Sequence, residues 1–107
     1  MAFRALERLI NLHDGYRRAF RIDGVEVLLV QEDGQRWIFG RRCPHADQAL
    51  DQAAISGTCV QCPRHGYRFS LQDGSALGTP CASLPVYTVV YEGNSLGVDD
   101  RRFADIP

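Results

Sequence analysis

Long apolar runs are missing from this sequence, and none approaches the roughly 20 residues that a helix needs to cross a bilayer. The first eight residues mix charged and apolar side chains and lack the apolar stretch of a secretion signal. A strong charge of either sign is also missing, since the formal net charge is −1 at pH 7. This balance argues against a nucleic-acid-binding module and against a membrane surface as partner. We therefore expect a cytoplasmic protein.

Internal repeats, low-complexity tracts and linkers are missing as well. With 107 residues the chain has the size of one ordinary domain, and its 45% hydrophobic content is that of a globular protein. A chain of this length buries roughly two-thirds of the surface that its unfolded form exposes, which suffices for one core. We therefore expect residues 1–107 to form a single domain.

Convincing helical periodicity is missing too, apart from a weak pattern at residues 46–54. Short segments rich in β-branched residues follow one another instead, separated by Asp-Gly pairs that favour two-residue hairpin turns because both turn positions need a positive φ. The expected strands cover residues 18–22, 25–31, 36–39, 58–61, 67–70, 86–91 and 96–98. This spacing predicts an all-β fold, a small antiparallel sandwich or barrel.

Two stretches, residues 41–50 and 61–66, fit no strand pattern and are expected to be loops. The first loop contains Cys43 and His45, and the second contains Cys62 and His65. Each loop thus offers one thiolate and one imidazole beside a proline. Such a ligand set suits zinc or iron–sulfur chemistry and suits magnesium or calcium poorly.

The order of the ligands helps to separate these two metals. Structural zinc sites usually pair like with like, as two cysteines followed by two histidines. Here each loop supplies one residue of each type, as C-x-H, sixteen residues and then C-x₂-H. A two-iron cluster with asymmetric ligation calls for two cysteines on one iron and two histidines on the other, and loops that each send one residue to each iron can provide them. A zinc-stabilised structural module remains an alternative.

The two loops and their surroundings resemble the Rieske [2Fe–2S] domain family. The matching residues are Cys43-Pro44-His45, Leu50, Cys62-Pro63-x-His65-Gly66-x-x-Phe69, Gly74, Pro80, Leu84, Pro85, Tyr87 and Val89. The resemblance implies a β-sandwich with a cluster-binding loop subdomain at one end and one [2Fe–2S] cluster per chain. It also implies that Cys43 and Cys62 bind the inner iron, while His45 and His65 bind the outer iron near the surface.

The resemblance further indicates a member of low reduction potential. High-potential members carry an additional disulfide between the loops, at positions that correspond to Gln48 and Arg64, and neither is a cysteine here. Those members also place serine and tyrosine hydroxyls near the cluster, at positions that match Tyr67 and Phe69. Phe69 has no hydroxyl, and that of Tyr67 has a different reach.

The function that follows is a one-electron carrier, not an enzyme with a small-molecule substrate of its own. Oxygenase subunits of the family add a domain with a mononuclear iron, whereas nothing follows Pro107 here and the remaining histidine is His13. The chain looks like a Rieske ferredoxin that relays electrons from a flavin reductase to an oxygenase. A small subunit resembling that of assimilatory nitrite reductase is the second candidate.

Four further residues are assigned secondary roles. Cys59 and Cys81 have no ligand spacing and are interpreted as small buried hydrophobic residues, with a disulfide between them or redox sensing as alternatives. Arg42 and Arg64 stand beside the ligands, where they are expected to attract an acidic redox partner.

Overall fold

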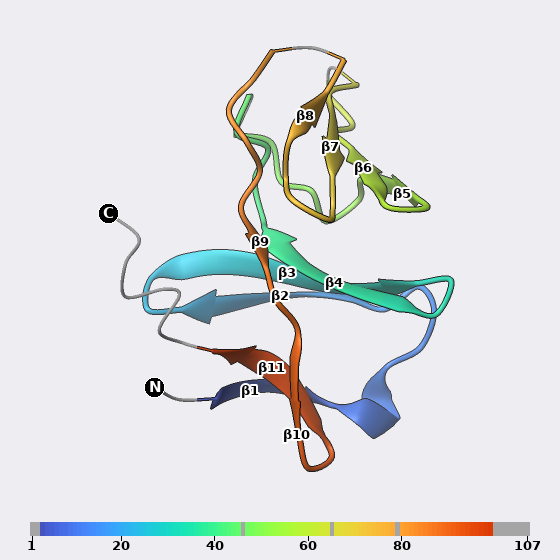
Figure 1. The fold of residues 1–107 in the computed structure, drawn as a ribbon, viewed down its shortest axis with the longest axis vertical. Coiled ribbons are helices and arrows are strands. Elements are labelled where there is room, and N and C mark those ends of the chain that lie inside the picture. The colour runs from blue at the N-terminus through green and yellow to red at the C-terminus, as the bar shows by residue number, and fades with distance from the viewer. Residues whose placement is uncertain (1–2, 46, 65, 79, 100–107) are drawn as a thin grey trace.

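Three antiparallel sheets stacked one above another make up the molecule (Figure 1). The computed structural model describes residues 3–45, 47–64, 66–78 and 80–99. Its strands are β1 (Phe3–Arg8), β2 (Arg17–Ile22), β3 (Val25–Glu32), β4 (Gln35–Gly40), β5 (Ala54–Ser56), β6 (Cys59–Gln61), β7 (Arg68–Ser70), β8 (Ala76–Leu77), β9 (Val86–Tyr87), β10 (Val90–Glu92) and β11 (Ser95–Asp99). A short 3₁₀ helix (Leu9–Asn11) follows β1. The expectation of an all-β fold is confirmed.

The three sheets differ in how far apart in the sequence their neighbouring strands lie. The middle sheet has the order β2-β3-β4-β9, and the sheet that carries the loops has the order β5-β6-β7-β8. The third sheet, β1-β11-β10, joins the beginning of the chain to its end. The middle and third sheets form the sandwich, and the loop-bearing sheet covers one end of it (Figure 1).

The hairpins of the middle sheet form where Asp-Gly pairs predict them. Asp23 and Gly24 have φ values of 49° and 84°, and Asp33 and Gly34 have values of 50° and 76°. Two consecutive positive φ angles define the turn whose twist matches that of the flanking strands. The strands on either side of both turns pair in register, so that Ile22 faces Val25 across the first turn.

β3 is buried on both faces and divides the interior into two cores. Leu28 and Val30 belong to the core beneath the loops, whereas Val27 and Leu29 belong to the core shared with the third sheet. All four side chains are at most 1% exposed. Because side chains alternate along a strand, this one strand supplies both cores.

The expectation of one continuous strand at residues 86–91 is wrong. Its first part is β9, which pairs with β4, and its last part is β10, which pairs with β11. Thr88 and Val89 between them belong to no strand. The segment is rich in β-branched and aromatic residues, but it leaves one sheet and enters another, which a pattern of residue types does not reveal.

Three strands were not predicted from the sequence, namely β1, β5 and β8. The weak helical pattern at residues 46–54 is not realised in its described part, where an isolated bridge between Ala49 and Arg42 and a turn at residues 51–52 precede β5. The amide of Leu50 donates to the carbonyl of Arg41 (2.7 Å) instead of to a helical partner. No helix among the described residues is long and apolar enough to span a membrane.

A carboxylate with three hydrogen-bond donors and one ion-pair partner ties β1 to β2. The side chain of Glu7 accepts hydrogen bonds from Asn11 Nδ2 (2.9 Å), from Tyr16 Oη (2.7 Å) and from the Arg8 amide (2.8 Å), and Arg18 lies 3.6 Å away. These donors, that of Asn11 foremost, lower the pKa of Glu7 from 4.5 to about 2.

Acid is therefore expected to weaken the contacts that the Glu7 carboxylate makes. A folded-state pKa below the unfolded one stabilises the fold above about pH 4.5, and this contribution is lost as the pH falls toward about 2. We expect Glu7→Gln to lower the free energy of unfolding at pH 7 and to flatten its decline between these pH values. Urea denaturation at a series of pH values measures this, with exposed Glu92→Gln as the control; equal pH profiles for the two variants would contradict the expectation.

Candidate metal centre

The two loops that carry the expected ligands have the same backbone closure. The carbonyl oxygen of Cys43 accepts a hydrogen bond from the Asp47 amide (2.7 Å), and that of Cys62 accepts one from the Gly66 amide (3.0 Å). Asp47 and Gly66 each have a positive φ, of 52° and 74°. The turn thus requires the left-handed region at its fifth residue, which glycine adopts readily and aspartate tolerates.

A second hydrogen bond also occurs at the same place within each of the two loops. The Cys43 amide donates to the carbonyl of Gln48 (2.8 Å), and the Cys62 amide donates to the carbonyl of Tyr67 (2.7 Å). Both loops are therefore six-residue turns that begin with a cysteine whose main chain is fixed on both sides. Two equivalent turns, each with a thiol at the same place, form two matching halves of one site.

The thiols lie inside the molecule, and the described imidazole lies outside. Cys43 is 1% exposed and Cys62 is 0% exposed, and both belong to the core beneath the loops. His45 is exposed, and its ring stacks on Tyr67 of the other loop, with centroids 3.7 Å apart and planes 7° from parallel. His65, the fourth expected ligand, lies outside the described residues. Of the expected ligands that the structure describes, the two cysteines are therefore buried and the histidine lies at the surface.

This donor set fits a two-iron cluster. A Rieske-type cluster takes two thiolates on one iron and two imidazoles on the other, so no iron needs more than two protein ligands. A tetrahedral structural zinc ion needs its protein ligands gathered around a single point. It is the order of the donors, one cysteine and one histidine in each loop, that favours the iron–sulfur interpretation over the zinc module.

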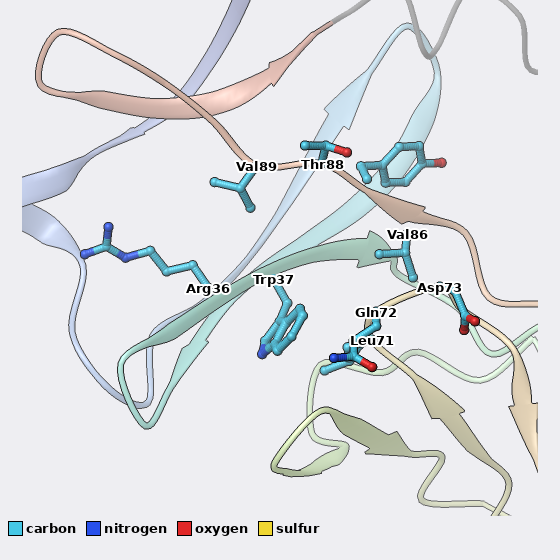
Figure 2. Close-up of a pocket in the computed structure, with 9 residues that line it drawn as sticks. Arg36, Trp37, Leu71, Gln72, Asp73, Val86, Thr88 and Val89 are labelled. Atoms are coloured by element: carbon cyan, nitrogen blue, oxygen red, sulfur yellow. The ribbon is translucent and has the colours of Figure 1, made fainter.

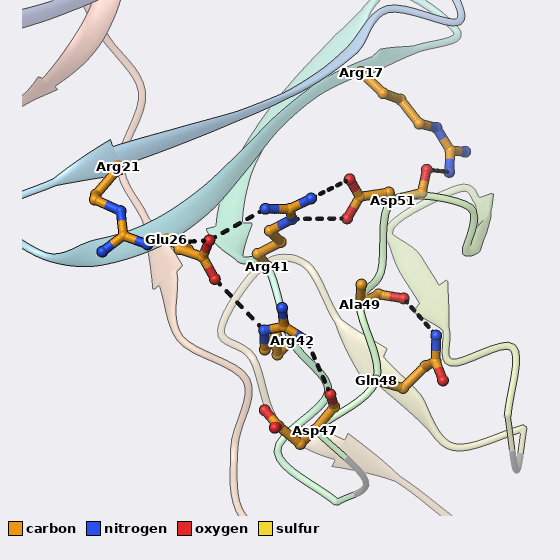
Figure 3. A network of polar contacts seen from close by, with 9 residues as sticks. All are labelled: Arg17, Arg21, Glu26, Arg41, Arg42, Asp47, Gln48, Ala49 and Asp51. Carbon is orange, nitrogen blue, oxygen red and sulfur yellow. Dashed lines mark hydrogen bonds and ion pairs between the residues drawn. The ribbon is translucent and has the colours of Figure 1, made fainter.

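Arginine side chains fix the base of the first loop to the sandwich (Figure 3). Arg41 makes two hydrogen bonds to the Asp51 carboxylate (3.0 and 3.1 Å) and a third to Glu26 of β3 (3.2 Å). Arg17 of β2 donates to the main-chain carbonyls of Asp51 and Ala53. These pairs join residues 10 to 36 positions apart in the sequence, so no local pattern predicts them.

The cysteines outside the loops are free thiols. The structure contains no bond between Cys59 and Cys81, and each is half-buried instead of fully buried as expected. Cys59 directs its thiol to the carbonyl of Val60 (3.8 Å), while Cys81 packs against the core beneath the loops.

A groove of about 460 Å³ lies apart from the described ligands, between β4, β9 and the turn after β7 (Figure 2). It is lined by Arg36, Trp37, Leu71, Gln72, Asp73, Val86, Tyr87, Thr88 and Val89. Neither Cys43, Cys62 nor His45 lines it. The candidate centre is therefore a feature of the loops, not of this groove.

Comparison with known proteins identifies a protein family whose model covers both loops. A family model described as "Rieske [2Fe-2S] domain" matches residues 5–88. Apoptosis-inducing factor 3 from Mus musculus is 33% identical over 64 residues, which are 60% of this chain but 11% of that protein. The ferredoxin subunit of biphenyl dioxygenase from Pseudomonas sp. (strain KKS102) is 29% identical over 84 residues, which are 77% of each chain.

Solved structures show the same architecture. The ferredoxin of carbazole 1,9a-dioxygenase from Nocardioides aromaticivorans IC177 superposes with a TM-score of 0.78 at 28% identity, covering 92% of this chain and 97% of that one. A putative NADH-dependent nitrite reductase small subunit from Mycobacterium tuberculosis has the same TM-score at 24% identity, covering 91% and 93%, a likeness of fold.

Proposed function

Because this chain belongs to the Rieske [2Fe–2S] domain family, we propose that it binds one [2Fe–2S] cluster through Cys43, His45, Cys62 and His65 and carries single electrons between redox proteins. The observation that supports this most directly is the repeated turn, which presents a buried cysteine from each loop to the same core. All four proposed ligands lie within residues 5–88, the range that the family model matches.

Each proposed ligand has a physical task. The cluster, when bound, takes up and releases one electron. The buried thiolates of Cys43 and Cys62 would hold the inner iron in an apolar surrounding that excludes water. His45 would hold the outer iron at the molecular surface, where the path for an electron to a partner protein is short. His65 completes the set by its position in the second loop.

The partners that suit this centre are other redox proteins. Among the relatives are ferredoxins of dioxygenase systems, which supports a relay from a reductase to a terminal oxygenase. Arg42 and Arg64 are exposed beside the proposed ligands and would attract an acidic partner surface. The shared fold of a nitrite reductase small subunit supports the second candidate, a subunit of that enzyme. The reducing cytoplasm would keep the two remaining cysteines, Cys59 and Cys81, as thiols.

Metal analysis of anaerobically purified protein tests the proposal. We expect equal amounts of iron and acid-labile sulfide, two of each per chain, and negligible zinc. One zinc per chain without sulfide would overturn the carrier in favour of the structural module. Electron transfer in vitro, from a flavin reductase to an oxygenase or to a sirohaem-containing nitrite reductase, separates the two partner systems.

We expect a reduction potential near the lower end of the Rieske range, about −150 mV. Hydrogen bonds to a cluster stabilise its reduced, more negative form, and Phe69 at one of the expected donor positions is fully buried and has no hydroxyl. A loss of two donors lowers the potential by on the order of 100 mV, since 59 mV corresponds to a tenfold change for one electron. Protein-film voltammetry measures the value, and a clearly positive potential would contradict this reasoning.

A further inference from the structure

We propose that Tyr67 is a positioning residue for His45, which it holds by ring stacking and not by its hydroxyl. The inference rests on the proposed function, because it gives the His45 ring a task as a ligand. Its basis is the close and nearly parallel contact between the two rings, 3.7 Å between centroids and 7° between planes. This contact joins the two loops directly.

Tyr67 is well anchored for this role. Its carbonyl oxygen accepts the hydrogen bond from the Cys62 amide (2.7 Å), so its main chain belongs to the closure of the second loop. Its half-buried side chain packs against the core that contains both buried cysteines. The Tyr67 ring is therefore held in place by its own loop and by the core. Through the stack it supports His45, an exposed residue of the other loop.

The stack determines the plane of the imidazole. The lone pair with which a histidine binds iron lies in the ring plane, so a neighbour that fixes the plane confines the direction of the lone pair to that plane. A tyrosine hydroxyl lies in the plane of its own ring and does not point at a ring stacked in parallel upon it. The phenyl ring alone should therefore suffice. It also shields one face of His45 from water.

The tyrosine ring also has an electrostatic effect. The face of an aromatic ring is electron-rich and attracts positive charge. An iron-bound imidazole is more positive when the cluster is oxidised than when it is reduced, so the stack favours the oxidised form. Water that replaced the ring would favour the more negative reduced form. Loss of the ring should thus raise the reduction potential through both effects.

Three variants of the purified holoprotein test this inference. We expect Tyr67→Phe to match the wild type in potential, in electron paramagnetic resonance g-values and in the rate of iron loss to a chelator. We expect Tyr67→Leu to raise the potential, to shift the g-values and to lose iron about three- to tenfold faster, as the strength of an aromatic pair indicates. Tyr91→Leu, at an exposed tyrosine of β10, is the matched control and should match the wild type.

The outcomes separate this inference from the proposed function. A wild type without sulfide overturns both. A wild type with an intact cluster and a Tyr67→Leu variant identical to it overturns the role of Tyr67 alone, and so does a Tyr67→Phe variant that behaves like Tyr67→Leu. Should Tyr67→Leu fail to fold or to load, Tyr67→Met keeps most of the apolar volume without the ring, and the same three readouts decide.

Discussion

Cys62→Ala is expected to yield a colourless protein that retains almost no iron or sulfide. The Cys62 side chain is 0% exposed and its amide closes the second loop, so as a proposed ligand its sulfur would be held in a fixed place away from water. Because a cluster that binds only the folded chain also stabilises it, the variant should melt at a lower temperature than the holoprotein. Visible absorption, iron and sulfide assays and thermal unfolding measure these effects.

The chain offers its own control for this substitution. Cys59 is half-buried in β6, outside the repeated turns, and its thiol interacts with the carbonyl of Val60. Cys59→Ala removes the same atoms and should keep full cluster content and colour. An intact cluster in Cys62→Ala, or its loss in Cys59→Ala, would refute the proposed ligand set.

Gly74→Ala is expected to destabilise the fold by about 3 kcal/mol or more, which is a large part of the stability of a small protein. Gly74 has a φ of 82°, where any other residue is strained, and a Cβ atom there would overlap the carbonyl oxygen of Leu84. The Leu84 amide donates to the Gly74 carbonyl (2.8 Å), so this close approach joins the turn after β7 to the segment that leads into β9.

Gly34→Ala is the control that separates the cost of backbone strain from the cost of the steric overlap with Leu84. Gly34 has a similar φ of 76°, but nothing lies within 4 Å of an added Cβ. It should therefore cost only the backbone strain, about 1 kcal/mol. Urea denaturation of both variants measures the difference, and equal losses would show that the contact with Leu84 contributes nothing.

Local signals account for the parts of the fold that the sequence predicts well. The turns at Asp23-Gly24 and Asp33-Gly34 need only two adjacent residues that tolerate a positive φ, so β2, β3 and β4 can be found without knowledge of the rest. The expected ligands stand out in the same way, since cysteine, proline and histidine recur within a few residues. The family match over residues 5–88 agrees with that interpretation.

The features that the sequence does not predict depend on partners far apart in the chain. β1 is a strand because β11, at the other end of the chain, supplies its hydrogen bonds. The break at Thr88 and Val89 arises because the strand before it pairs with β4 and the strand after it pairs with β11 of another sheet. Likewise, the pairing of Arg41 with Asp51 and the stacking of Tyr67 on His45 require the folded loops, and neither has a local pattern.

The division of β3 between two cores has a consequence for the whole molecule. Neighbouring residues such as Leu28 and Leu29 occupy opposite compartments, so a slip by one position would exchange the contents of both at once. The hairpin turns at Asp23-Gly24 and Asp33-Gly34 fix the position of this strand and thereby assign each of its side chains to one core.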